Sequence, residues 1–412
     1  MLSLTKKQKI LVSSILLIAM FQYPNIATSP AVHKIQTEVF SNYPLSTIQT
    51  VMAMSSISAP LSSLFSSFLI RRKVMSKRFA VIFGVTVLGM VGVLSALFHT
   101  KLWFLGVLSA LLGLSGGFYV TSSLSILIDN FEGEQRQRVT GLQALGVSVG
   151  GVLLSIIGGL LVEVVWYGSY AFMMIALPLA AYAAYAIPKI TMVTAEQTEE
   201  AAPVLPDGVK KVDKSKFNID ILYYVLCQML MFFFYLVCNH NISVHLARSG
   251  VENYSVAAGF ASAFAMGGSV LFSSFFKKLT QKFGDMLIVM GFLLQALGYT
   301  LLNLCDFSLI LMMLSVFLVG SAQGTLCPQC TLSVSKRVDE TTSTLAMALV
   351  STVAAGAGGF LSPVIITNVT EALAGDNTNY RYQFTAFLAL AAAVIFFLLN
   401  KYRAKKQAGM YD

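Results

Sequence analysis

Amides and phenols inside long apolar stretches are the side chains of this sequence whose chemistry stands out. They are Gln22, Tyr23, Asn25, Tyr119, Gln228, Tyr235, Asn239 and Gln323. Such groups donate and accept hydrogen bonds, so several of them facing one space would hold a neutral or weakly polar small molecule. A single Gln between apolar helices more often bonds a neighbouring helix. That alternative stays open for each residue taken alone.

Residues for covalent or metal chemistry are few and scattered. Cys327 and Cys330 have C-x-x-C spacing, but zinc would need further Cys or His ligands and this stretch offers none. We interpret all five cysteines as packing residues. No histidine has an evident carboxylate partner; the four are His33, His99, His240 and His245. The nucleotide-binding loop G-x-x-x-x-G-K-[ST] does not occur. The sequence therefore predicts no enzyme, no metal site and no cofactor, with an intramembrane enzyme as a remote alternative.

The composition says which elements must position these side chains. Of the 412 residues, 56% are hydrophobic and 11% are charged, and the mean hydropathy is +0.74. Soluble domains carry about 25% charged residues. Too few charges are present to cover a soluble globule, so we expect an integral membrane protein in a lipid bilayer.

Apolar stretches of about 20 residues, the length that crosses a bilayer as a helix, occur twelve times. A barrel is disfavoured because its strands would alternate with a period of two. The fold class expected is therefore all-α. The predicted spans are roughly 10–32, 47–70, 79–98, 102–128, 139–162, 168–188, 218–240, 255–276, 285–304, 307–333, 343–367 and 382–400.

The basic residues predict the orientation of these spans. If the N-terminus is cytoplasmic, all but four of the 28 Lys and Arg residues fall on the cytoplasmic side, as in the positive-inside rule. The four exceptions are Lys34, Lys101, Arg248 and Arg381. The net charge of +9 thus indicates topology in a cell membrane, with both termini cytoplasmic, rather than nucleic-acid binding.

The spans form two groups of six. Residues 1–188 and 217–412 would be the two halves, and the polar segment 189–216 a flexible cytoplasmic linker. Residues 66–84 align without a gap to 273–291, with Ser66, Ser67, Phe68 and Gly84 repeated 207 residues later. The glycine pair at 150–151 likewise has a counterpart in the glycine pair at 358–359. We interpret the match as a parallel internal repeat.

With this topology the chain resembles the major facilitator superfamily. The loop KKLTQKFGD keeps Lys282 and Gly284 of the family's loop motif, while the first-half loop RRKVMSKR keeps only the charge. The segment at 27–40 resembles the drug/proton antiporter branch, but the Gly-Gly pair at 150–151 lacks that branch's preceding proline. The resemblance implies alternating access by a monomer, with the first, fourth, seventh and tenth spans lining the cavity.

We therefore expect a secondary or facilitative transporter of a small neutral or weakly polar organic solute. Asp129 would pair with Lys77 or Arg78 as a gate, and His240 is the possible proton site because no other titratable group lies deep in a span. Alternatives are an exporter of lipophilic drugs and a receptor without transport activity.

The sequence also predicts roles for acids at helix ends, for glycine-rich helix faces and for three glycosylation motifs. Asp220 and Asp285 would favour the N-termini of their helices. Glycine-rich faces would serve either static packing or a surface on which the halves move. Three N-x-S/T sites are possible glycosylation sites: Asn241, Asn253 and Asn368.

Overall fold

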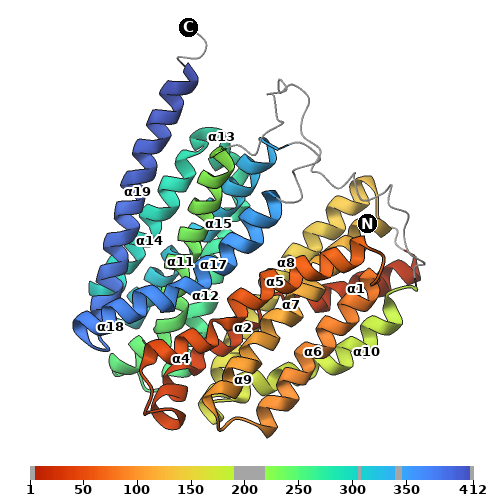
Figure 1. Ribbon diagram of the computed structural model, residues 1–412, viewed down its shortest axis with the longest axis horizontal. Coiled ribbons are helices and arrows are strands. Elements are labelled where there is room, and N and C mark those ends of the chain that lie inside the picture. Colours follow the sequence, from red (N-terminus) through yellow and green to blue (C-terminus); the bar gives the residue numbers. More distant parts are fainter. Residues whose placement is uncertain (1–4, 190–218, 305–307, 339–345, 409–412) are drawn as a thin grey trace. The chain divides into compact units, whose positions relative to one another are not determined.

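The computed structural model describes residues 5–189, 219–304, 308–338 and 346–408, and the regular elements within these ranges are helices (Figure 1). The chain divides into two compact units, Met1–Lys210 and Lys211–Asp412, called unit 1 and unit 2 below. Within the described ranges, eleven helices are long and apolar enough to cross a membrane, or twelve if one bent pair is a single span. Apart from Lys189, the predicted linker lies outside the described residues.

Unit 1 begins with a helix that carries a capping box, in which Thr5 and Gln8 bond each other's backbone. Short 3-10 turns at Ser29–Ala31 and Phe172–Ile175 and a π-helical turn at Ile35–Val39 connect several of its elements. Its α-helices are α1 (Lys6–Ala19), α2 (Pro24–Thr28), α3 (Val32–Lys34), α4 (Leu45–Met52), α5 (Met54–Arg71), α6 (Lys77–Leu97), α7 (Leu102–Asn130), α8 (Gly133–Val164), α9 (Gly168–Ala171) and α10 (Ala176–Ala186).

In unit 2, α14 lies beside both α15 and α19 (Figure 1). Its helices are α11 (Ile219–Arg248), α12 (Tyr254–Ser274), α13 (Phe276–Phe283), α14 (Met286–Leu304), α15 (Leu309–Ser335), α17 (Ala354–Leu361), α18 (Asn368–Ala374) and α19 (Thr378–Ala408). Two π-helical turns, Leu349–Val353 and Ser362–Thr367, interrupt the span that contains α17.

The first predicted span is broken rather than continuous. Its two parts, Lys6–Ala19 and Pro24–Val39, are bent by 42° relative to each other. Pro24 has no N–H to donate, so it suits the first turn of α2 and cannot bond the carbonyl of Met20 as a continuous helix would require.

Three predicted boundaries also change. The basic loop at 277–284 contains the short helix α13, which has no buried residue. Helix α11 continues eight residues beyond its apolar stretch, and α19 begins four residues before its own. Polar residues continue both helices because other elements of unit 2 bury and hydrogen-bond them.

Equivalent contacts in the two units follow the internal repeat. Ser66 Oγ donates to the carbonyl of Gly117, and Ser273 Oγ donates to that of Gly324, both over 3.3 Å. Donor and acceptor are each separated from their counterparts by 207 residues. The sequence match therefore coincides with the same interhelical hydrogen bond.

The glycine-rich faces pack helices together inside each unit. A Cβ on Gly150 would lie 2.2 Å from Met20 Cα, and one on Gly358 would lie 2.1 Å from the carbonyl oxygen of Met229. A Cβ on Gly158 would meet the carbonyl of Ala27 at 2.2 Å. The static-packing interpretation thus accounts for these three glycines, because only a residue without a side chain lets the backbones come this close.

Candidate functional site

The break in the first span places three of the expected polar residues in or beside irregular backbone. Gln22 and Tyr23 lie between α1 and α2, Asn25 lies in the first turn of α2, and all three are partly exposed. Irregular backbone within a membrane is tolerated where protein or a cavity satisfies its polar groups.

Tyr119 supports this break. It is fully buried in α7, and its hydroxyl donates to the carbonyl of Phe21, which α1 leaves free. Glycines of α8 pack on both sides of the break, against Met20 and Ala27. In this conformation Tyr119 therefore positions the first span, whereas the side chains of Gln22, Tyr23 and Asn25 are partly exposed.

A second polar cluster joins α11 and α15 in unit 2. Gln228 is 3% exposed, and its Nε2 donates to Cys327 Sγ over 3.1 Å. Gln323 lies one turn before Cys327, on the same face of α15. The Oε1 atoms of Gln228 and Gln323 are buried and accept no hydrogen bond from the described residues. Since an unmade hydrogen bond at a buried carbonyl is costly, this cluster is suited to a ligand that donates hydrogen bonds.

Tyr235, Asn239 and His240 continue along α11 and are nearly buried, with exposed fractions of 7–9%. A hollow of about 10 Å³, room for about one water molecule, is lined by Tyr235, Asn239 and Ser262 among others. Tyr235 and Asn239 therefore border only a very small space, and His240 leaves equally little surface exposed.

At the predicted cytoplasmic end of unit 1, Lys77 is the basic residue that reaches Asp129. Its Nζ lies 2.6 Å from Asp129 Oδ2, and the two side chains are 23% and 27% exposed. Arg78 instead donates to the carbonyl of Ala184 over 2.6 Å. All of these residues belong to unit 1, so the contact fastens the start of α6 to the end of α7.

The equivalent end of unit 2 is organised by Asp285, just before α14. One carboxylate oxygen accepts from Tyr224 over 2.6 Å, and the other accepts from Gln329 and Ser333, each over 2.9 Å. Asp285 keeps its predicted position at the start of α14 and in addition bonds α11 and α15. Asp220 likewise lies 3.0 Å from Arg403 of α19, so both acids connect different helices.

Burial alone would raise the pKa of Asp285, but the hydrogen bonds from Tyr224, Gln329 and Ser333 outweigh it and hold that pKa below its usual value. A depressed pKa in the folded state means that this stabilisation is present above the unfolded pKa, about 3.9, and is lost as the pH falls through the folded value.

We expect Asp285→Asn to lower the free energy of unfolding by about 1–3 kcal/mol at neutral pH, because charge-assisted hydrogen bonds are lost. Thermal unfolding of both proteins in detergent, repeated from pH 7 to pH 3, measures this difference. It should shrink below about pH 4 as the wild-type carboxylate becomes protonated. A difference that stays constant over this range would show that the charge of Asp285 contributes nothing.

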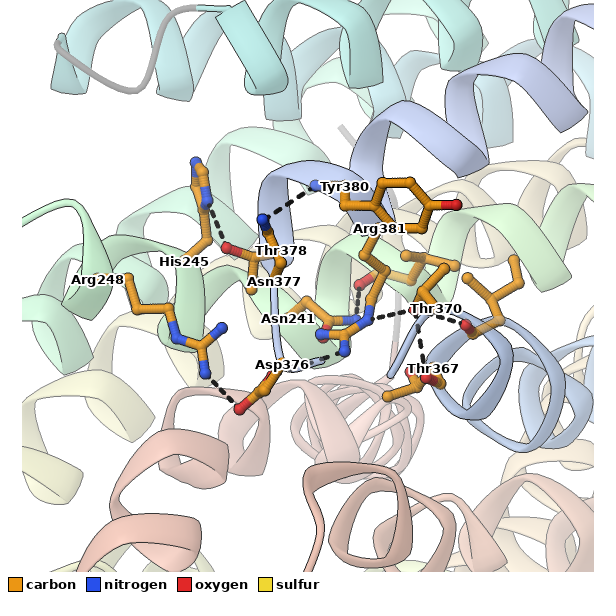
Figure 2. A network of polar contacts seen from close by, with 12 residues as sticks. Asn241, His245, Arg248, Thr367, Thr370, Asp376, Asn377, Thr378, Tyr380 and Arg381 are labelled. Carbon is orange, nitrogen blue, oxygen red and sulfur yellow. Dashed lines mark hydrogen bonds and ion pairs between the residues drawn. The ribbon is translucent and has the colours of Figure 1, made fainter. Parts of the chain in front are cut away.

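A buried arginine at the predicted outer end of unit 2 was missed by the sequence analysis, which placed it in a loop (Figure 2). Arg381, in the first turn of α19, is 0% exposed. It donates to Asn241 Oδ1 over 2.7 Å and to Thr370 Oγ1 over 3.0 Å, and it lies 3.6 Å from Asp376 Oδ1. Asp376 also pairs with Arg248. The spacing of Arg381 with Thr385, Ala389 and Ala393, all on one buried face, was the signal available.

The same cluster changes two other expectations. Asn241 is 0% exposed, so the folded protein does not present it for glycosylation, whereas Asn253 and Asn368 are exposed. His245 is also buried, and its Nδ1 lies 3.1 Å from Thr378 Oγ1. The cluster thus ties the end of α11 to the start of α19 through internal polar contacts.

Among the described residues, no group of three or more His, Cys, Asp or Glu side chains is placed to hold a metal ion. The free thiols of Cys227 and Cys330 are fully buried, and Cys327 accepts the hydrogen bond from Gln228. The broken first span with Gln22, Tyr23 and Asn25, and the cluster of Gln228 and Gln323, therefore offer hydrogen bonding by neutral groups.

Comparisons with known proteins agree with this architecture. The model of the Major Facilitator Superfamily matches residues 11–363. The crystal structure of the nucleoside transporter NupG is similar with a TM-score of 0.73 at 13% identity, covering 96% of this chain and 100% of the other. The crystal structure of the peptide transporter POT in complex with sulfate is similar with a TM-score of 0.75 at 13% identity, covering 97% of this chain and 98% of the other. The search of curated proteins gave no significant match.

Proposed function

Because the chain belongs to the Major Facilitator Superfamily and is a multi-pass secondary transporter rather than an enzyme, we propose that it moves a small neutral or weakly polar organic solute by alternating access. The observation that carries this proposal is the pair of buried, unpartnered carboxamide oxygens on Gln228 and Gln323. A solute with N–H or O–H groups would supply the missing donors.

The distribution of charge supports a neutral solute. Within the described spans, every Asp, Glu, Lys and Arg lies in the first or last two turns. Arg381, the most buried of them, is held by Asn241, Thr370 and Asp376. A strongly charged solute would need a countercharge at depth. We propose that amides and phenols contact the solute instead: Gln22, Tyr23, Asn25, Gln228 and Gln323.

Uptake and counterflow in proteoliposomes test the proposal. We would offer uridine, glucose and a neutral dipeptide amide in parallel with glutamate and tetraphenylphosphonium. A carrier of neutral solutes should show saturable counterflow with a member of the first group, and Gln228→Ala or Gln323→Ala should raise its KM about tenfold, the equivalent of one lost hydrogen bond of about 1.4 kcal/mol. Counterflow of the charged compounds alone would contradict the proposal, and tetraphenylphosphonium would then favour drug export.

Gln295 offers a matched control. It is 0% exposed in α14, its Nε2 donates to the carbonyl of Met231 over 3.0 Å, and its buried Oε1, like those of Gln228 and Gln323, accepts no hydrogen bond from the described residues. It differs in position, because α14 corresponds to the ninth predicted span, which is not among the four expected to line the cavity. Gln295→Ala should therefore lower the melting temperature while leaving the KM unchanged. An equal rise in KM for this variant would show that the effect at Gln228 is a general loss of packing.

The Lys77–Asp129 ion pair is proposed to stabilise the conformation that is closed to the cytoplasm. Asp129→Asn should then slow exchange several-fold, and the swapped pair Lys77→Asp with Asp129→Lys should restore part of the rate. Since exposed ion pairs stabilise by at most about 1 kcal/mol, the melting temperature should change little. An unchanged exchange rate in Asp129→Asn excludes the gating role.

Proton coupling through a buried carboxylate is not expected, and His240 is the proposed site if coupling occurs. It is 8% exposed in α11. Uptake with and without an imposed pH gradient tests this, because gradient-driven accumulation that survives His240→Gln would place the coupling elsewhere.

The proposed orientation has both termini in the cytoplasm. Val74 is 70% exposed between α5 and α6, and Thr100 is exposed between α6 and α7. In a cysteine-free background, a membrane-impermeant maleimide added to intact cells should label Thr100→Cys and spare Val74→Cys until the cells are opened. The reverse pattern would overturn the orientation drawn from the basic residues.

A further inference from the structure

An open hollow of about 570 Å³ lies where α12 and α15 begin, at the predicted outer end of unit 2. Its volume is within the range of small-molecule sites, about 300–1,000 Å³. The lining residues come from the loop before α12 and from one face of each helix: Val251, Glu252, Asn253, Val256, Ala257, Phe260, Phe264, Leu309 and Met313. Unit 2 alone forms this hollow.

Two aromatic rings and one methionine are among the residues that line the hollow. Phe260 and Phe264 follow each other by one turn of α12 and are 43% and 48% exposed, and Met313 faces the hollow from α15. Aromatic rings attract cations through their faces, and methionine adapts to differently shaped apolar groups. This wall therefore suits an apolar body that carries a positive charge.

The loop contributes one carboxylate. Glu252 is exposed, and among the described residues it takes part in none of the ion pairs, whereas Asp376 at the same end is shared by Arg248 and Arg381. Its negative charge is thus available at the edge of an aromatic hollow. Water and apolar surface meet at this place, which favours an amphiphile.

We propose that this hollow binds a diffusible lipophilic cation, with its apolar body against Phe260 and Phe264 and its charge beside Glu252. A lipid with an ethanolamine headgroup also carries a positive charge, but its phosphate would lie close to Glu252 as well and be repelled. The site is separate from the Gln228 and Gln323 cluster, so it goes beyond the proposed solute pathway.

Tetraphenylphosphonium is a suitable probe, and the full-length protein in phosphatidylcholine nanodiscs is the sample. Equilibrium dialysis, corrected with empty nanodiscs, should give saturable binding to the wild type. Glu252→Gln and Phe260→Ala should each weaken it at least about fivefold, in the range expected for a partly exposed cation site. Neutral triphenylphosphine oxide should bind the wild type and Glu252→Gln equally.

Two controls make the same chemical changes elsewhere. Glu38→Gln removes an exposed carboxylate of unit 1, and Phe387→Ala removes a ring that is 67% exposed on α19. Neither should alter the affinity. Because Glu252 is exposed, Glu252→Gln should also keep the wild-type melting temperature, so that weaker binding is not a folding defect.

Three results would overturn the proposal. Equal affinity of wild type and Glu252→Gln would remove the role of the carboxylate. Binding lost in Gln228→Ala but retained in Glu252→Gln would place the cation at the polar cluster of α11 and α15. If phosphatidylethanolamine lowers the affinity of the wild type but not of Glu252→Gln, the occupant is a lipid. The solute assay with Gln228→Ala is independent of all three.

Discussion

Asp376→Asn should lower the free energy of unfolding by about 3–5 kcal/mol, because it leaves the guanidinium of Arg381 buried without its acidic partner. Arg381 is 0% exposed, and its Nη2 lies 3.6 Å from Asp376 Oδ1. Asn241 and Thr370 would still accept its hydrogen bonds, but neither carries a charge. Thermal unfolding in detergent, with guanidinium-free buffers, measures the loss.

Arg248→Gln is the matched control, because Arg248 pairs with the same carboxylate and its side chain is 34% exposed. Removing it leaves Asp376 and Arg381 together, so the cost should be at most about 1 kcal/mol, as for other exposed pairs. If both variants lose a similar free energy of unfolding, the burial of Arg381 does not make its ion pair with Asp376 more stabilising than the exposed one.

Gly117→Ala should destabilise unit 1 by about 3 kcal/mol or more, whereas the neighbouring Gly116→Ala should not. A Cβ on Gly117 would lie 1.9 Å from Ser62 Oγ and 2.5 Å from the carbonyl oxygen of Ala59, so α5 and α7 would have to separate. A Cβ on Gly116 meets no atom within 4 Å, and alanine there adds up to about 1 kcal/mol of helix propensity.

The same comparison can be repeated in unit 2. A Cβ on Gly268 would lie 2.2 Å from the carbonyl oxygen of Phe317, and one on Gly267 would meet nothing within 4 Å. Gly268→Ala should therefore lower the melting temperature and Gly267→Ala should not. If both members of either pair behave alike, close approach of the helix backbones is not what these glycines provide.

The spans and their repeat could be predicted from the sequence because lipid imposes simple conditions. Each crossing needs about 20 apolar residues in a helix that satisfies its own backbone, and such stretches are visible without knowing their neighbours. The repeated Ser66 and Ser273 could likewise be found by alignment, and the structure gives both the same hydrogen bond.

Helix boundaries at polar residues could not be predicted in this way. The apolar stretch of the first helix of unit 2 ends near His240, yet α11 continues to Arg248, and α19 begins early enough to include Arg381. A hydropathy pattern places the end of a membrane helix at the first polar residues. In the tertiary structure the helix continues through such residues when a partner from a distant segment hydrogen-bonds the buried group, as Asn241 does for Arg381.

Residue types alone therefore identified which polar side chains lie within apolar spans and can exchange hydrogen bonds. The tertiary structure decided which of them are already used. The hydroxyl of Tyr119 donates to the carbonyl of Phe21, whereas the buried Oε1 atoms of Gln228 and Gln323 accept no hydrogen bond from the part of the chain that the structure describes. The difference depends on pairwise distances between segments far apart in the chain, and hydrogen bonds act only within about 3 Å, a range that composition and periodicity do not specify.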